Sequence, residues 1–71
     1  MAHETYKGHL ILSRPDHTAD SFWRPYVRVT WEDQSGVHSH EFIDTGIVFD
    51  TEDAAIAYGF AVARLWIDEE L

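Results

Sequence analysis

The sequence predicts an α+β fold: a three-stranded antiparallel meander with one C-terminal helix packed on one face, in the order β-β-β-α. Three observations indicate this fold. Apolar and polar residues alternate in three segments before residue 44, as is typical of strands. Residues 54–67 contain a single charged side chain and show helical spacing. Polar and glycine-containing stretches separate these segments, which is typical of turns.

The three strands are expected at residues 6–13, 25–31 and 37–43. The first, YKGHLILS, alternates along its whole length and is followed by a polar connector, RPDHTADS, at residues 14–21. The second, PYVRVTW, begins at a proline, where the missing N–H group is tolerated. The third, VHSHEFI, follows the stretch EDQSG, which has the length and composition of a hairpin turn.

The helix is expected at residues 51–68. Asp50 or Thr51 can cap its first turn, and Glu52 and Asp53 lie where the helix dipole favours negative charge. With 71 residues, the chain has the length of one domain, which we expect to span residues 1–71.

The predicted helix carries two apolar stripes, which together span about 260° instead of the little over 100° of an ordinary surface helix. One stripe comprises Ala54, Tyr58, Ala61 and Leu65, and the other comprises Ile56, Phe60, Ala63 and Ile67. One sheet face covers one stripe. We therefore expect a symmetric homodimer in which helix packs against helix through Ile56, Phe60, Ala63 and Ile67. The alternative is that residues 47–49 and the loop of residues 14–24, with Phe22 and Trp23, wrap the second stripe.

Composition excludes several classes of protein. A hydrophobic content of 45% excludes a disordered acidic tail, and the absence of cysteine excludes disulfides. The net charge of −8 opposes binding to nucleic acids and anionic membranes. No signal peptide or long apolar run is present, so the expected location is cytoplasmic without membrane contact. The sequence shows neither a nucleophile elbow nor a glycine-rich phosphate loop, so we expect no enzymatic activity and no cofactor.

Basic and aromatic residues gather on the sheet face that points away from the helix in this interpretation. These residues are Lys7, His9, Arg24, Tyr26 and Arg28. The favoured interpretation of these residues is a sheet face that is kept solvated by its polar side chains, and a nucleic-acid-binding face is the alternative. In the leading functional hypothesis the same face is presented to an unknown protein partner.

His38 and His40 fall on the same face of the third strand, because side chains two residues apart point the same way. Two imidazoles at this spacing are weak candidates for a metal site, which requires a third and usually a fourth ligand. The expected function is therefore that of a non-enzymatic, homodimeric protein–protein interaction domain. Nucleic-acid binding and metal binding are the alternatives.

Four stretches resemble a family of small uncharacterised bacterial proteins: YKGHLI at 6–11, WRP at 23–25, HEF at 40–42 and FDTEDAAIAYGFAVARLWID at 49–68. This resemblance covers nearly the whole chain and implies no activity. The three strands, the Phe-x-Thr helix entry and the alanine-rich helix are also similar to plant AP2-type DNA-binding domains, which read DNA with arginines and tryptophans of the sheet. Only Arg24 and Arg28 loosely correspond to those arginines, and Gly59 stands at that family's tyrosine position. That resemblance implies a shared topology.

Overall fold

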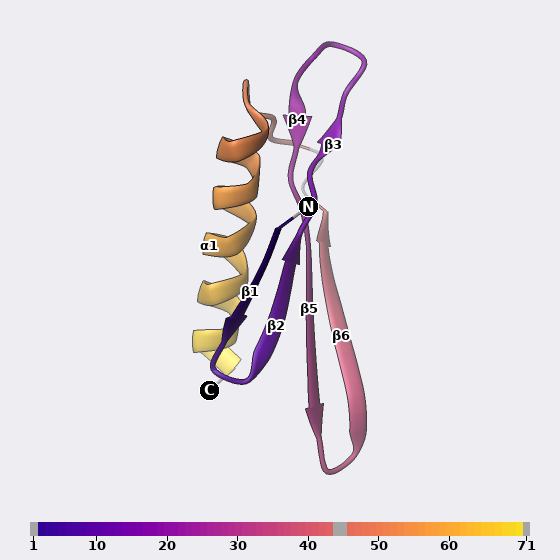
Figure 1. The fold of residues 1–71 in the computed structure, drawn as a ribbon, viewed down its shortest axis with the longest axis vertical. Coiled ribbons are helices and arrows are strands. Elements are labelled where there is room, and N and C mark those ends of the chain that lie inside the picture. The colour runs from indigo at the N-terminus through magenta and orange to yellow at the C-terminus, as the bar shows by residue number, and fades with distance from the viewer. Residues whose placement is uncertain (1, 44–45, 71) are drawn as a thin grey trace.

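The computed structural model describes residues 2–43 and 46–70, except for the side chain of residue 70. It is an α+β structure in which an antiparallel sheet is covered on one face by a single C-terminal helix (Figure 1). The predicted fold class is confirmed, but the three-stranded meander is wrong, because six strands are present in the described residues. These are β1 (Ala2–Tyr6), β2 (His9–Ser13), β3 (Asp16–His17), β4 (Trp23–Arg24), β5 (Tyr26–Asp33) and β6 (Gly36–Ile43).

The main sheet has four antiparallel strands in the order β1-β2-β5-β6, and β3 and β4 form a separate two-stranded ribbon. Val27 and Val29 of β5 face Phe42 and His40 of β6 across the predicted hairpin. In the other direction Val29 pairs with Ile11 of β2. The chain is elongated, with extents of 43 × 20 × 18 Å. Figure 1 shows why: the β3–β4 ribbon extends toward one end and the β5–β6 hairpin toward the other.

Residues 6–13 form a hairpin and not the single strand that their alternation predicts. Lys7 and Gly8 both have positive φ, at 49° and 78°, as the two central residues of a type I′ turn require. Tyr6 and His9 flank the turn as a pair. Lysine is an unusual residue for this conformation, which is why the turn leaves little trace in the sequence.

The polar connector is also more ordered than its composition indicates. Asp16 pairs with Arg24, and His17 pairs with Trp23, so the ribbon prolongs the connection between β2 and β5. Trp23 in turn exchanges two backbone hydrogen bonds with Phe49, of 2.8 and 2.9 Å. The segment that leads into the helix is therefore fixed to the ribbon.

The helix α1 spans Glu52–Glu70, close to the predicted range. The hydroxyl oxygen of Thr51 accepts a hydrogen bond of 3.1 Å from the backbone N–H of Ala54, so Thr51 caps the helix as expected. The helix packs mainly on β2 and β5, with further contacts to β1 and β4. The edge strand β6 meets the helix through Trp66, whose ring contacts His40 and Phe42.

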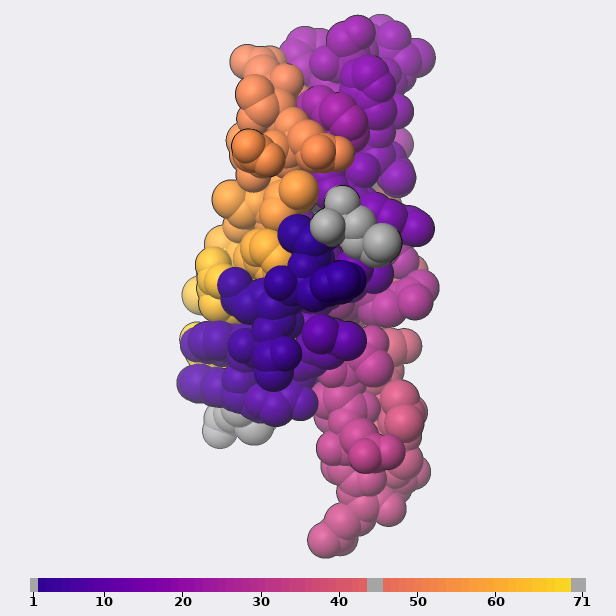
Figure 2. All heavy atoms as spheres, in the orientation of Figure 1, coloured from indigo at the N-terminus to yellow at the C-terminus, as the bar shows by residue number. Residues whose placement is uncertain are grey.

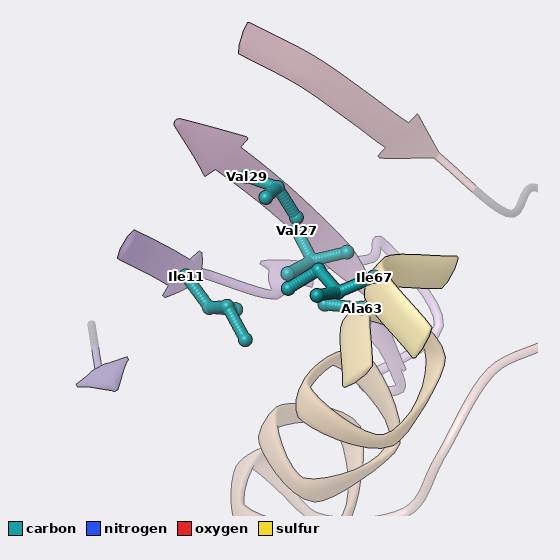
Figure 3. Packing of buried hydrophobic residues seen from close by; sticks show 5 residues of the cluster. All are labelled: Ile11, Val27, Val29, Ala63 and Ile67. Atoms are coloured by element: carbon teal, nitrogen blue, oxygen red, sulfur yellow. The ribbon is translucent and has the colours of Figure 1, made fainter. Parts of the chain in front are cut away.

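The stripe that faces the sheet has a residue at every fourth position. Ala55, Ala63 and Ile67 are fully buried, and Gly59 is buried between them. Figure 3 shows Ala63 and Ile67 packed against Val27, with Val29 and Ile11 extending the core along the sheet. The small residues allow the helix to approach the strands closely.

This helix orientation corrects the predicted dimer interface. Ala63 and Ile67 lie in the core of one chain, so they cannot form a helix–helix interface. Ile56 and Phe60 flank the core and are partly buried. In the other predicted stripe Ala54, Ala61 and Leu65 are exposed, whereas Tyr58 is half-buried against Phe49, with ring centroids 5.2 Å apart. Leu65 is 65% exposed.

Candidate functional site

The strand β6 forms one edge of the main sheet and has the features of a binding site for an extended chain. Among the described residues it pairs with β5 alone. It is eight residues long and contains neither lysine nor proline, the residues that commonly protect edge strands from further pairing. Its outer backbone groups are therefore available to another strand.

The direction of these backbone groups follows from the register. The backbone N–H of Arg14 donates to the carbonyl of Tyr26, so even-numbered residues of β5 bond toward β2. Hydrogen-bonding direction alternates along a strand, so the odd-numbered residues of β5 bond toward β6. Their partners are the even-numbered residues of β6. Residues 37, 39, 41 and 43 consequently direct their N–H and C=O groups away from the sheet.

Side chains on both faces of β6 are poorly covered. On the face away from the helix, Val37 is 69% exposed and Ile43 is 59% exposed. On the helix side, His40 is exposed, and His38 and Phe42 are half-buried. Figure 2 shows the β5–β6 hairpin, in pink, extending past the rest of the molecule.

A groove of about 480 Å³ runs between the C-terminal half of β6 and the helix. Most of its lining residues are apolar. The lining residues are Pro25, Val27, Glu41, Phe42, Ile43, Tyr58, Gly59 and Val62. An apolar groove beside an unpaired strand edge provides backbone bonding and side-chain pockets together, as strand-addition sites do.

An aromatic cluster lies on the helix-facing side of β6, beyond the end of the groove. The ring of Trp66 stacks on His40 with centroids 4.9 Å apart and planes inclined by 3°. It also contacts Trp31 at 5.5 Å and Phe42 at 5.7 Å. Trp66 therefore reaches from α1 over β5 to β6, and it anchors the edge strand from one side without covering its outer edge.

The opposite edge strand, β1, has a different environment. It is five residues long. Glu4 accepts a hydrogen bond of 2.5 Å from Arg64 of the helix, and the hydroxyl of Tyr6 donates to Asp68 at 3.0 Å. These contacts fasten β1 to α1. Of the two edges, β6 is the longer and the less tied to the helix.

The predicted open-face surface is only partly assembled. Tyr26 and Arg28 do share the face away from the helix, where both donate hydrogen bonds to Glu41, of 2.8 and 3.0 Å. The hydroxyl of Tyr26, followed by the guanidinium of Arg28, lowers the pKa of Glu41. The guanidinium of Arg14 lies 5.2 Å from the centre of the Tyr26 ring. Glu41 offsets the charge of Arg28, so the cluster of Arg14, Arg28 and Glu41 keeps one net positive charge, too little for an extended phosphate-binding surface.

Three other residues predicted on that face lie elsewhere. Lys7 binds Asp68 of the helix at 2.6 Å, an interaction that raises the pKa of Lys7 and lowers that of Asp68. His9 lies on the helix side, 5.4 Å from Trp31. Both placements correct the prediction, and both follow from the turn at Lys7 and Gly8. Arg24 belongs to the β3–β4 ribbon, where its Nε is buried and has no hydrogen-bond partner within the described chain.

The two candidate metal ligands have other partners. The Nε2 of His38 lies 3.0 Å from the carboxylate of Asp33 and 2.8 Å from the hydroxyl of Ser35. His40 is stacked on Trp66. In residues 2–43 and 46–70, no group of three histidine, aspartate or glutamate side chains suited to a metal ion is found.

The Asp33, Ser35 and His38 contacts organise the tip of the β5–β6 hairpin. The carboxylate of Asp33 accepts hydrogen bonds from the hydroxyl and the backbone N–H of Ser35, of 2.6 and 2.7 Å. These bonds, with a smaller contribution from His38, lower the pKa of Asp33 to about 2. The tip is thereby held in one conformation although it projects into solvent.

Compared with protein-family models, curated proteins and solved structures, the chain gives no significant match. None of the helical segments in the described part of the chain has the length and apolar character needed to cross a membrane. The functional interpretation therefore depends on the geometry of this one chain.

Sequence reasoning missed the outer edge of β6 as a candidate binding site, and it missed the groove. One signal was present: the third predicted strand has apolar residues at Val37 and Ile43 on the face opposite Phe42, and it lacks lysine and proline. The predicted meander already places this strand at an edge of the sheet, but the groove beside it depends on the position of the helix, which the sequence pattern does not determine.

Proposed function

We propose that the protein is a non-enzymatic protein–protein interaction domain that receives an extended segment of its partner along the outer edge of β6. The observation that supports this function is the unpaired eight-residue edge beside an apolar groove. A partner strand would bond to the outward backbone groups and insert alternate side chains between β6 and α1. Such binding is the β-augmentation mode of peptide recognition.

The magnitudes are sufficient for specific binding. Each backbone hydrogen bond contributes a net of about 0.5–1.5 kcal/mol, and each apolar side chain buried in the groove about 1.5–3 kcal/mol. Several of each would exceed the several kcal/mol that association and ordering of the peptide cost. The two earlier alternatives have weaker support. Arg28 is paired with Glu41, and Lys7 is paired with Asp68 away from the open face. The two histidines have local partners.

A peptide-display selection against the folded, immobilised protein tests this proposal. We expect enrichment of peptides that combine β-forming residues with apolar side chains at alternate positions. Val62→Glu, which places a charge in the groove, should weaken binding of the selected peptides about tenfold or more, because a charge buried without a partner is costly.

A matched pair of proline variants locates the site. Ser39→Pro removes an outward N–H of β6 and should abolish binding of the selected peptides. Thr5→Pro is the control, since Thr5 lies on β1 and its N–H points outward from the opposite edge. Circular dichroism is the control that tests whether both variants are folded. Selected peptides that bind Ser39→Pro and Val62→Glu as tightly as the unchanged protein would disprove the proposal.

A further inference from the structure

We infer that the partner strand at this edge is β6 of a second copy of the chain, so that two main sheets join into one antiparallel sheet of eight strands. This inference rests on the proposed function and names its partner. It also replaces the helix-to-helix dimer with a dimer in which the helices do not touch. Three properties of β6 support it: its side-chain order, its backbone direction and the position of α1.

The side-chain order of β6 is self-complementary in one register. In this register the two copies of β6 run antiparallel, with the His40 residues of both copies opposite each other. Side chains on each face of β6 then lie opposite side chains of the second copy that are compatible with them. Val37 lies opposite Ile43, His38 opposite Phe42, Ser39 opposite Glu41, and His40 opposite its own equivalent. Val37 and Ile43 are the two most exposed apolar side chains of β6, so this register covers both.

Neighbouring registers are less favourable. Centring on Glu41 places two carboxylates directly opposite each other, which is destabilising in a cross-strand pair. Centring on Ser39 places Val37 opposite Glu41 and leaves Ile43 beyond the ladder. A shift by a single residue brings the helix-side residues of one copy opposite the open-face residues of the other. The register centred on His40 avoids all three conflicts.

The backbone groups match in the same register. Residues 37, 39, 41 and 43 point outward in each copy, and this register pairs residue 37 with 43 and residue 39 with 41. Each such pair is therefore a hydrogen-bonded pair of an antiparallel ladder. His40 pairs with its equivalent at a non-hydrogen-bonded position, where the two Cα atoms approach to about 4.5 Å.

The position of α1 leaves room for the second copy. The helix packs over β2 and β5, so the helices of two joined copies would lie roughly 19 Å apart on the same face, given strand spacings of about 4.8 Å. This separation exceeds the 8–10 Å of packed helices. The aromatic side chains Trp66 and Phe42 of both copies would line the space between the helices.

Charge opposes the assembly and makes it salt-dependent. Each chain carries a formal net charge of −8, so two copies repel each other at low ionic strength. Added salt screens this repulsion over distances of about 10 Å at 0.1 M. We therefore expect the dimer population to increase with salt, opposite to the behaviour of an interface held by ion pairs.

Sedimentation from micromolar to millimolar concentration tests the dimer. The expected result is a concentration-dependent mass that rises from 8.2 kDa toward twice that value and rises further with salt. Ser39→Pro should remain monomeric, whereas Thr5→Pro on the opposite edge should dimerise like the unchanged chain. A mass of one chain at every concentration would overturn the inference.

Opposite charges introduced at residues 37 and 43 test the register. This experiment does not require the Ser39→Pro variant to fold. Val37→Lys and Ile43→Glu should each raise the dissociation constant of the homodimer about a hundredfold, because the two-fold symmetry removes two equivalent apolar contacts, each worth about tenfold. A mixture of the two variants should form heterodimers, because the introduced lysine and glutamate then lie opposite each other. Equal association of the mixture and the separate variants would overturn the register.

A thiol at the two-fold axis gives a direct readout. The chain contains no cysteine, so His40→Cys introduces a single thiol, and two equivalents about 4.5 Å apart are within disulfide distance. Mild oxidation should link His40→Cys into covalent dimers rapidly, and the control Leu65→Cys on the exposed helix face should link slowly. Faster linking of Leu65→Cys would indicate a helix-mediated dimer and overturn the inference. A monomeric chain whose edge still binds the selected peptides would disprove the dimer and leave the proposed function intact.

Discussion

The hydroxyl oxygen of Ser13 lies 2.5 Å from the point that a Cβ atom on Gly59 would occupy. Ser13 is fully buried on β2, and its hydroxyl donates a hydrogen bond of 3.1 Å to the carbonyl of Ile56 on the helix. Glycine at position 59 is therefore a packing requirement, since the helix meets β2 at this point with no space for a side chain. Together the two residues set the distance between the helix and the sheet.

Gly59→Ala tests this contact. Overpacking against Ser13 should cost about 1–3 kcal/mol, partly offset by the roughly 1 kcal/mol gain in helix propensity. In a Ser13→Ala background the obstructing oxygen is gone, and the same substitution should be neutral or stabilising. Urea unfolding of the two single variants and the double variant gives the coupling free energy between positions 13 and 59. Equal effects of Gly59→Ala in both backgrounds would contradict the close approach.

The orientation of the helix predicts a large difference in the effect of alanine substitution at two apolar residues that are two positions apart. Ile67→Ala removes a fully buried side chain and should lower the free energy of unfolding by about 2–5 kcal/mol. Leu65→Ala changes a side chain that is 65% exposed and should alter stability by less than about 0.5 kcal/mol. Both variants are measured by urea unfolding at a concentration where the chain is monomeric. A larger loss of stability in Leu65→Ala than in Ile67→Ala would show that the helix stripe containing Leu65 faces the sheet, as the predicted helix-to-helix dimer requires.

The turn between β1 and β2 requires glycine for its backbone conformation. Gly8 has a φ of 78°, and a Cβ there would meet no atom within 4 Å. Gly8→Ala should therefore cost about 1–2 kcal/mol through backbone strain alone. Gly8→Asn should cost less, because asparagine tolerates the left-handed conformation. Thermal unfolding compares the two variants, and indistinguishable midpoints would argue against the type I′ turn.

Asp33 predicts an acid-dependent loss of stability at the hairpin tip. Its pKa is lowered from 3.8 to about 2, so the folded chain binds this proton less readily than the unfolded chain. The stabilisation is present above about pH 4 and is lost as pH falls through 2. Asp33→Asn should reduce the unfolding temperature at pH 7, and the difference from the unchanged chain should shrink toward pH 2. A difference in unfolding temperature that stays constant between pH 7 and pH 2 would contradict this role of Asp33.

The β5–β6 hairpin, the helix and the α+β class are predictable because each has a strong local pattern. Val27 and Val29 alternate with polar residues, and EDQSG marks the turn between the strands. Thr51 and the acidic residues after it mark the start of the helix. These features depend on residues close together in the chain.

The faces of the first strands could not be predicted, because a two-residue turn interrupts an unbroken alternation. Tyr6 and His9 share a face across the turn, whereas in a continuous strand they would point to opposite faces. The residues of β2 are thereby shifted to the other side. In a continuous strand Ile11 and Ser13 would share the open face with Lys7, but both are in the core, and His9 is on the same side as they are.

The orientation of the helix was undetermined for a different reason. A helical wheel shows two apolar stripes but does not show which one contacts the sheet. Ala55, Gly59 and Ala63 suit close approach to a helix or to a strand equally well. The choice depends on the buried hydroxyl of Ser13 and on the side chains of β2 and β5, which lie far away in the sequence.

The contact between Trp31 and Trp66 gives the molecule its own optical reporter. Their rings are 5.5 Å apart and inclined by 52°, and one belongs to β5 while the other belongs to the helix. The strong electronic transitions of two indoles this close are coupled, which produces paired bands of opposite sign in the far-ultraviolet circular dichroism spectrum. Those bands exist only while the helix is docked, so detachment of the helix can be followed without any added label.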